Sequence, residues 1–164
     1  MGSAPYILAM HVVLVEPQIP QNTGSIARTC AATKTALHLI EPMPFKIDEK
    51  RVKRAGLDYW PYVELHQHAS WEEYLKTANP ERIWYFSKFG ERSYYEADYK
   101  ADDCLVFGSE TKGLGKQFLS AVSSHQIVRI PIFEQAVRSL NLSNAVSIGL
   151  YEALRQLAQQ EKSP

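Results

Sequence analysis

Short apolar runs alternate with helical segments along most of this sequence. Runs at 11–15, 37–40, 83–86, 104–107 and 127–130 have four or five residues each, and a further strand is expected at 62–65. Apolar strands this short are typical of a parallel sheet that is buried on both faces. The alternation therefore predicts an α/β fold, with a single doubly wound domain, a parallel sheet and a ligand site at the carboxyl ends of its strands.

Helices are expected between these strands, and several have recognisable ends. One should cover residues 24–34, and a charged stretch at 48–55 also has helical character. Ser70 and Glu73 form a capping box that opens another helix, and Asn79 with the proline after it should end that helix. A long amphipathic helix should begin at Asn141. Its apolar positions are Leu142, Ala145, Val146, Leu150, Ala153, Leu154 and Leu157.

The length and composition suit one domain with its own core. The chain has 164 residues, of which 45% are hydrophobic and 22% charged, as in ordinary globular proteins. We expect residues 1–9 to form a leader, 10–160 the domain and 161–164 a tail. The sequence leaves open whether Met1 or Met10 is the natural start.

The cysteines and the charge balance narrow the classes of function. Cys30 and Cys104 fall in apolar segments, which predicts reduced core thiols and a cytoplasmic protein. No run approaches the roughly 20 apolar residues of a membrane span, so no membrane partner is expected. Lys and Arg total 18, as do Asp and Glu. Nucleic-acid binding would therefore need a local basic patch.

Several common site motifs are incomplete. Gly108 and Gly113 have the spacing of a P-loop, but Leu114 stands where the phosphate-binding lysine belongs. No dinucleotide fingerprint or nucleophile elbow is complete either. His66 and His68 have no companion ligands nearby, so we interpret them as two exposed histidines before a helix. No metal site is expected.

Three polar segments, at 17–28, 105–114 and 130–145, each follow or include the end of an apolar strand. Such loops are where α/β proteins place their chemistry. Taken singly, each is better explained as a structural feature, such as a helix cap at 22–24 or a turn at Gly108. Together they resemble the three signature segments of the SPOUT methyltransferases. Residues 54–59 are similar to those of the TrmL group, which methylates the ribose 2′-hydroxyl at the wobble position of tRNA.

The resemblance extends from about Met10 to Gln160, although the loop at 133–138 is about one residue longer than in the TrmL group. It implies a C-terminal trefoil knot, which is a rare topology. It also implies S-adenosylmethionine as the cofactor, no metal, and a homodimer with the site near its interface. Gly108 suits a cofactor site because a ligand can approach a backbone that lacks a Cβ. The residues implied to bind the cofactor are Phe86, Gly108, Ile130, Ser139 and Leu140.

Arg28 is the residue to which the resemblance gives the catalytic role. In some relatives the matching arginine is assigned as a general base. An arginine side chain keeps its proton in proteins. A fixed cation that stabilises the forming alkoxide or clamps a phosphate is therefore the role that chemistry favours. Whether Arg28 is a base or a fixed cation stays open.

The densest basic run is expected to contact RNA, above all through Lys53 and Arg54, although such a run is also typical of a solvated helix face. Tyr59, Trp60 and Tyr62 follow and suit stacking on the unpaired bases of a tRNA anticodon stem-loop. The resemblance thus implies methyl transfer to the ribose of cytidine 34 or a modified uridine 34. Two alternatives stay open: a non-catalytic RNA- or nucleotide-binding α/β module, and a SPOUT methyltransferase that acts on rRNA.

Overall fold

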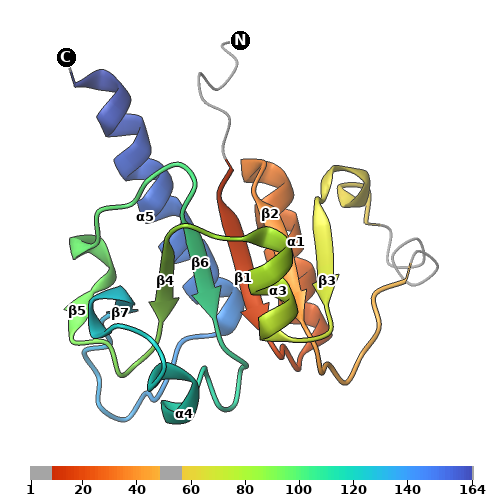
Figure 1. The fold of residues 1–164 in the computed structure, drawn as a ribbon, viewed down its shortest axis with the longest axis horizontal. Helices are drawn as coiled ribbons and strands as arrows, with labels where there is room; N and C mark the ends of the chain where they lie inside the picture. Colours follow the sequence, from red (N-terminus) through yellow and green to blue (C-terminus); the bar gives the residue numbers. More distant parts are fainter. Residues whose placement is uncertain (1–8, 49–56, 164) are drawn as a thin grey trace.

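The computed structural model describes residues 9–48 and 57–163. Within these residues, seven strands form one sheet in the order β3-β2-β1-β6-β4-β7-β5, and all neighbouring strands are parallel (Figure 1). The predicted α/β domain with a parallel sheet is therefore confirmed. The strands are β1 (His11–Val15), β2 (Ala36–Ile40), β3 (Leu65–His68), β4 (Ile83–Phe86), β5 (Arg92–Ser93), β6 (Cys104–Phe107) and β7 (Ile127–Arg129).

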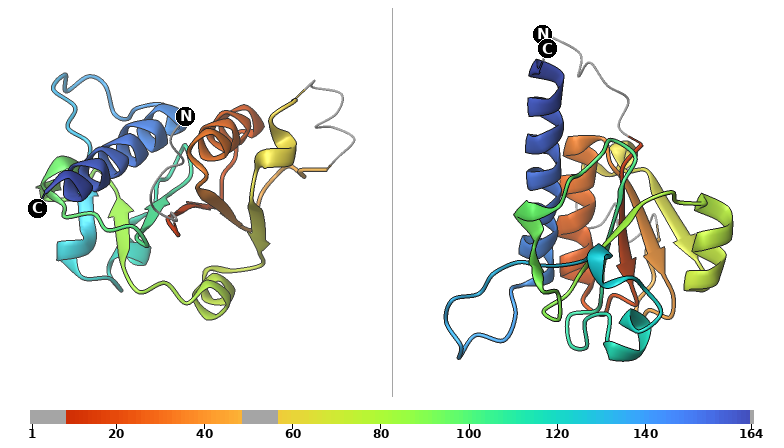
Figure 2. Two further views of the ribbon diagram at one scale, coloured as in Figure 1. Left: turned by 90° about the horizontal axis from the view of Figure 1, so that it is seen from above. Right: turned by 60° about the vertical axis from the view of Figure 1, so that its left-hand side comes forward.

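Helices lie on both faces of this sheet. The two longest, α1 (Pro20–Thr33) and α5 (Leu142–Lys162), lie side by side on one face, and α3 (Trp71–Ala78) lies on the other (Figure 2). The short α4 (Lys116–Leu119) sits beyond the carboxyl end of β6 (Figure 1). The described residues also form three 3₁₀ turns, Trp60–Tyr62, Tyr94–Glu96 and Ser124–Gln126.

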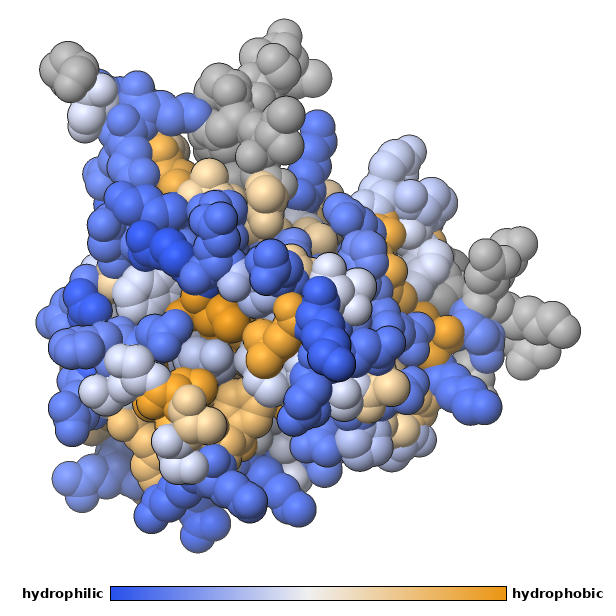
Figure 3. Space-filling model, in the orientation of Figure 1, coloured by the Kyte–Doolittle hydropathy of each residue, from blue (hydrophilic) through white to orange (hydrophobic). Residues whose placement is uncertain are grey.

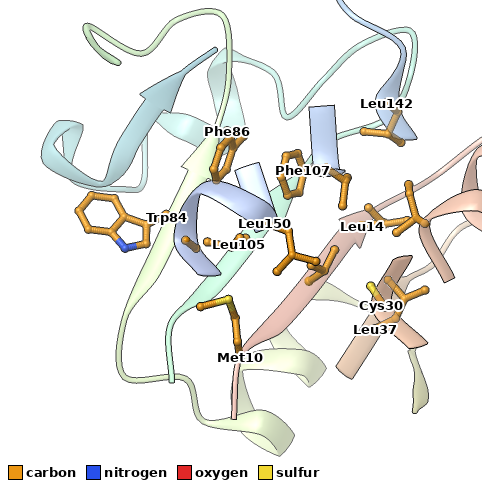
Figure 4. Close-up of a cluster of buried hydrophobic side chains, with 14 of the residues drawn as sticks. Met10, Leu14, Cys30, Leu37, Trp84, Phe86, Leu105, Phe107, Leu142 and Leu150 are labelled. Carbon is orange, nitrogen blue, oxygen red and sulfur yellow. The ribbon is translucent and has the colours of Figure 1, made fainter. Parts of the chain in front are cut away.

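The alternating side chains of the strands build two cores. In β1, Val12 and Leu14 are fully buried among residues of α1 and α5, whereas Val13 packs on the α3 side. Figure 4 shows the larger core, in which Leu150 of α5 and Cys30 of α1 lie over the strands. On the opposite face the cover is shorter, and apolar atoms reach the surface over the lower parts of β4 and β6 (Figure 3). α3 therefore covers its face of the sheet only in part.

The helix ends follow the local signals. Ser70 caps α3 by accepting a hydrogen bond from the Glu73 backbone N–H, and Asn79 ends that helix in a left-handed conformation. Asn141 caps α5 through its side-chain oxygen. These predicted boundaries are confirmed. α1 begins four residues earlier than expected, at Pro20, because the fixed φ of proline suits the first turn of a helix and its missing N–H has no intrahelical partner there.

Two other predicted elements, a strand and a helix, are not confirmed. The strand expected at 62–65 is wrong: Pro61 enters a 3₁₀ turn that ends at Tyr62, and β3 begins only at Leu65. The helix expected at 48–55 lies almost entirely outside the described residues. Cys30 and Cys104 are buried and unpaired, as predicted.

The interpretation of His66 and His68 as two exposed residues is confirmed for His66 and wrong for His68. Both lie in β3, and His68 is buried. Their side chains share one face of the sheet with His11 of β1 and His38 of β2, because the parallel register places His38 beside His66. The ring of His38 stacks 4.6 Å from that of His66, and its Nδ1 lies 2.8 Å from Nε2 of His68. The period of two along a strand, and not the local motif, brings these four residues together.

Candidate functional site

A pocket of about 350 Å³ opens at the carboxyl ends of β4, β6 and β7. Its walls come from the segments that follow those strands, namely 87–89, 108–115 and 130–140, and from the first turn of α5. The volume lies within the usual range of small-molecule sites. The position is the one expected for the ligand of an open parallel sheet.

All five residues implied to bind the cofactor line this pocket, although they come from three distant parts of the chain. They are Phe86, Gly108, Ile130, Ser139 and Leu140. The ring of Phe86 stacks on Phe107 with 4.5 Å between centroids and gives the pocket an aromatic wall. Their assignment to the cofactor stays a prediction.

Gly108 is required by the chain itself. A Cβ on this residue would lie 2.0 Å from the backbone carbon of Gly113 and 2.2 Å from the backbone nitrogen of Leu114. The turn at 109–113 folds back on the end of β6, where backbone hydrogen bonds join Ser109 and Gly113 in both directions. Any side chain at position 108 would therefore displace this turn, whether or not a ligand is bound.

The chemical character of the lining fits S-adenosylmethionine. Phe86, Leu142 and Ala145 provide apolar surface of the kind that an adenine ring needs, and such slots with a few polar groups are typical of cofactor sites. Arg138, Lys112 and Glu110 also line the pocket, so both signs of charge are present, as a zwitterionic amino-acid end requires. The glycine-bearing turn presents backbone groups to the same space.

One hydrogen-bonded network joins the three polar segments. The carboxylate of Glu110 accepts hydrogen bonds from the backbone N–H groups of Gln18 (2.8 Å) and Ile19 (3.1 Å) and from the side-chain amide of Asn22 (3.4 Å). The side-chain amide of Asn141 donates to Oδ1 of Asn22 at 3.0 Å. The start of α1 is thereby tied to the turn after β6 and to the first residues of α5.

Glu110 and Asn22 lie in two of the three polar segments, and Asn141 was expected only to begin the last helix. A signal was present, because each is a polar residue in a different segment at the end of a strand. Nothing local indicated that these side chains meet, since 88 residues separate Asn22 from Glu110 and 119 separate it from Asn141.

Arg28 lies on the exposed side of α1 and does not line the pocket. Its guanidinium carbon is 5.6 Å from the centroid of the Tyr59 ring, a cation–π arrangement. The Tyr59 hydroxyl donates a hydrogen bond of 3.1 Å to the carbonyl oxygen of Gly24. Burial raises the pKa of Tyr59, and the Arg28 cation opposes that shift. Tyr59 thus remains a protonated donor that links Arg28 to the first turns of α1.

The residues expected to contact RNA are placed only in part. Lys53 and Arg54 lie outside the described residues. Tyr62 is exposed, whereas Tyr59 and Trp60 are partly buried against the core. Tyr59 is therefore a structural support of Arg28, and Trp60 and Tyr62 keep surface that a base can reach.

In residues 9–48 and 57–163, no three His, Cys, Asp or Glu side chains come together in a way that could hold a metal ion. No helix in the same residues has the length and apolar character needed to cross a membrane.

The geometry agrees with the similarity of the chain to known proteins. A tRNA (cytidine(34)-2′-O)-methyltransferase from Saccharophagus degradans is 46% identical over 147 residues, which are 90% of this chain and 95% of that protein. A solved structure described as giving insight into 2-OH methylation of C/U34 on tRNA is 44% identical, with a TM-score of 0.82, and the match covers 92% of this chain and 97% of that one.

More distant structures share the fold. The SpoU methyltransferase AviRb from Streptomyces viridochromogenes, solved in complex with the cofactor AdoMet, is 26% identical with a TM-score of 0.76, and the match covers 94% of this chain and 63% of that one. The family model described as the SpoU rRNA Methylase family matches residues 9–151. The sheet, the pocket and this match over most of the chain lead to one conclusion: the chain belongs to the SpoU methylase family.

Proposed function

We propose that this protein is an enzyme that transfers a methyl group from S-adenosylmethionine to the ribose 2′-hydroxyl of nucleotide 34 of tRNA, a cytidine or a modified uridine. The observation that carries the proposal is the pocket in which three distant segments meet, in a chain that matches a tRNA (cytidine(34)-2′-O)-methyltransferase over nearly its whole length. The AdoMet-bound relative supports the same cofactor.

The bound cofactor would supply a methyl group already activated by its sulfonium. The pocket would hold it through Phe86, Gly108, Ile130, Ser139 and Leu140, mostly by backbone contacts and apolar surface. The chain's remaining tasks are to orient the ribose and to accommodate the charge that forms when its hydroxyl loses a proton. Arg28 suits the second task, because the Tyr59 ring fixes its guanidinium at the protein surface.

The partner is proposed to be the anticodon stem-loop, held partly by Lys53 and Arg54, whose charges would contact phosphates. We also propose that the protein is a cytoplasmic homodimer. Exposed apolar surface on α5 supports self-association, since Ile148 is 37% and Tyr151 55% exposed. A C-terminal trefoil knot is proposed as well, because the segments at 108–115 and 130–140 enclose the pocket beside the start of α5.

The alternatives have less support. The family description names rRNA, but the relative at 46% identity is named for tRNA, and its length matches this chain. A binding module without catalysis would leave the support of Arg28 by Tyr59 unexplained.

Mass spectrometry of RNA after incubation with enzyme and S-adenosylmethionine tests the proposal. Unmodified tRNA should gain one methyl group, recovered as a 2′-O-methylated nucleoside from position 34. Ribosomal RNA under the same conditions is the comparison substrate, and enzyme with S-adenosylhomocysteine in place of the donor is the blank. Methylation of rRNA alone would favour the rRNA alternative, and methylation of neither RNA would contradict the proposal.

A further inference from the structure

A second, smaller hollow lies beside the first two turns of α1. Its volume is about 170 Å³, against about 350 Å³ for the cofactor pocket. Part of its wall is aromatic, and it carries a cation, Lys46, and a carboxylate, Asp48. The residues that matter here are Pro20, Thr23, Gly24, Phe45, Lys46 and Trp60. The hollow is too small for a whole nucleoside with its methionine chain, and its walls suit one flat ring.

Gly24 shows that the space beside the helix is kept open. A glycine inside a helix costs roughly 0.5–1 kcal/mol relative to alanine. The backbone of Gly24 does not need a glycine, because its φ is not positive, and a Cβ there would meet nothing within 4 Å. No neighbour within the described residues therefore requires a glycine at position 24. A ligand that packs against the bare backbone would require one.

The position of the hollow connects it to the proposed chemistry. Gly24 lines it, and the carbonyl oxygen of Gly24 receives the hydrogen bond from Tyr59, whose ring supports Arg28 one turn further along α1. On the other side, the backbone N–H of Ile19, next to Pro20, is held by Glu110 of the cofactor pocket. The start of α1 thus stands between the two cavities.

The chemistry of the walls points to RNA. Phe45 and Trp60 offer aromatic surface, and stacking on aromatic side chains is how unpaired bases are held. Lys46 is exposed at the same hollow and can meet a phosphate. We propose that this hollow is a subsite for one unpaired base of the RNA substrate, in the loop that carries the methylated nucleotide. The proposal rests on the RNA substrate of the proposed function.

A cycle that combines a protein change with a base deletion tests the subsite. The probe is a fluorophore-labelled anticodon stem-loop RNA, made intact and as a series with one abasic nucleotide at each loop position. Gly24→Leu fills the hollow. We expect one abasic position to weaken wild-type binding about tenfold, the scale of one lost stacking contact. Gly24→Leu should weaken binding of the intact RNA by a similar factor and should be indifferent to that abasic position.

Ala32→Leu is the matched control, because it adds the same side chain to an exposed position of α1 outside the hollow. It should bind RNA like the wild type, and all variants should keep their S-adenosylmethionine affinity. Phe45→Ala replaces Gly24→Leu if the latter does not fold. Two results would overturn the subsite. One is wild-type affinity of Gly24→Leu for the intact RNA, and the other is that every abasic position weakens binding to Gly24→Leu by the same factor as binding to the wild type. If the wild type methylates nucleotide 34 in these cases, only the subsite fails; if it neither binds nor methylates the RNA, the proposed function fails too.

Discussion

At the scale of single residues, the surroundings of Arg28 favour its proposed role as a fixed cation. The side chain is exposed, yet its guanidinium rests against the Tyr59 ring, and Tyr59 is tied to the backbone of α1. A cation held in place on a helix can stabilise developing negative charge without reorganising during the reaction. The fork of the guanidinium also gives a directional pair of donors that an ammonium lacks.

Replacement of Arg28 should therefore affect the rate more than cofactor binding. Arg28→Ala should lower the single-turnover methylation rate by about 10²–10³-fold, the usual cost of deleting one electrostatic stabiliser. Arg28→Lys keeps the charge but should stay largely inactive. Single-turnover kinetics at saturating tRNA give the rate, and titration calorimetry should give unchanged S-adenosylmethionine affinity. A wild-type methylation rate in Arg28→Ala would show that Arg28 has no part in catalysis and is an ordinary surface residue.

At the scale of elements, Glu110 joins the start of α1 to the turn after β6. Its carboxylate accepts two backbone hydrogen bonds and one from Asn22, and charge-assisted bonds of this kind are stronger than neutral ones. Through Asn22 and Asn141 the connection reaches the first turn of α5. The geometry of the cofactor pocket thus depends on a contact between elements far apart in the sequence.

Glu110→Gln should loosen this junction. An amide has one acceptor oxygen, so at least one backbone N–H loses its partner, and we expect the free energy of unfolding to fall by about 1–2 kcal/mol. The affinity for S-adenosylmethionine should fall as well, because Glu110 lines the pocket. Urea denaturation and calorimetry measure the two effects. Glu81→Gln, at an exposed position, is the control. Unchanged stability and affinity in Glu110→Gln would show that the junction does not depend on the carboxylate.

The histidine cluster of β1, β2 and β3 should make the free energy of unfolding depend on pH. Burial, helped by the neighbouring imidazoles, lowers the pKa of His38 to about 3 and also lowers the pKa of His11 and of His68. Glu64 and Glu73 act in the opposite direction on His11 and His68. A histidine in the unfolded chain has a pKa near 6.5. Below that pH, the unfolded chain therefore binds protons that the folded cluster does not bind.

The contribution of the cluster to the free energy of unfolding should therefore be fully present above about pH 6.5, and it should be lost as the pH drops towards 3. For His38 alone the slope approaches about 1.4 kcal/mol per pH unit in this window. Urea denaturation at pH 7 and pH 5.5 measures it, and this range lies above the titration of ordinary carboxylates. His38→Leu should flatten the slope, whereas His125→Gln, at an exposed position, should leave it unchanged. An equal slope in His38→Leu and wild type would exclude the cluster as its source.

The sequence predicted most elements, because periodicity and caps are local. Five of the seven strands were located, namely β1, β2, β4, β6 and β7. β5 was missed because it is only two residues long, and the strand expected at 62–65 was wrong because a turn that contains Pro61 precedes β3, which begins only at Leu65. The pocket residues were found by resemblance. The link between Glu110 and Asn22, the histidine cluster and the internal need for Gly108 depend on tertiary contacts, and no local pattern encodes them.

At the scale of the whole molecule, α5 presents apolar surface that the domain does not cover. Ile148 and Tyr151 point away from the buried stripe of Leu142, Val146 and Leu150. A self-complementary helix face of this kind suits a two-fold interface. A dimer would also bring two copies of each basic residue to one RNA arm, which a domain of balanced charge needs.

Light scattering at micromolar concentration should therefore give about twice the monomer mass of 18.6 kDa. Ile148→Asp combined with Tyr151→Asp should shift the mass towards the monomer and weaken tRNA binding, since a charge is costly in an apolar interface. Arg155→Asp is not a suitable control, because Arg155 pairs with Glu152. Gln159→Asp, at an exposed position near the end of α5, serves better. A wild-type mass of 18.6 kDa would contradict the dimer.

The central claim is that the acceptor is the 2′-hydroxyl of nucleotide 34. Its most direct test is transfer of an isotopically labelled methyl group to two otherwise identical tRNAs, one with a ribose and one with a 2′-deoxyribose at position 34. We predict one labelled methyl group per ribose-containing tRNA and none on the deoxy tRNA, although both should bind with similar affinity. Label on the deoxy tRNA, or label that maps to another nucleotide of the ribose tRNA, would contradict the account.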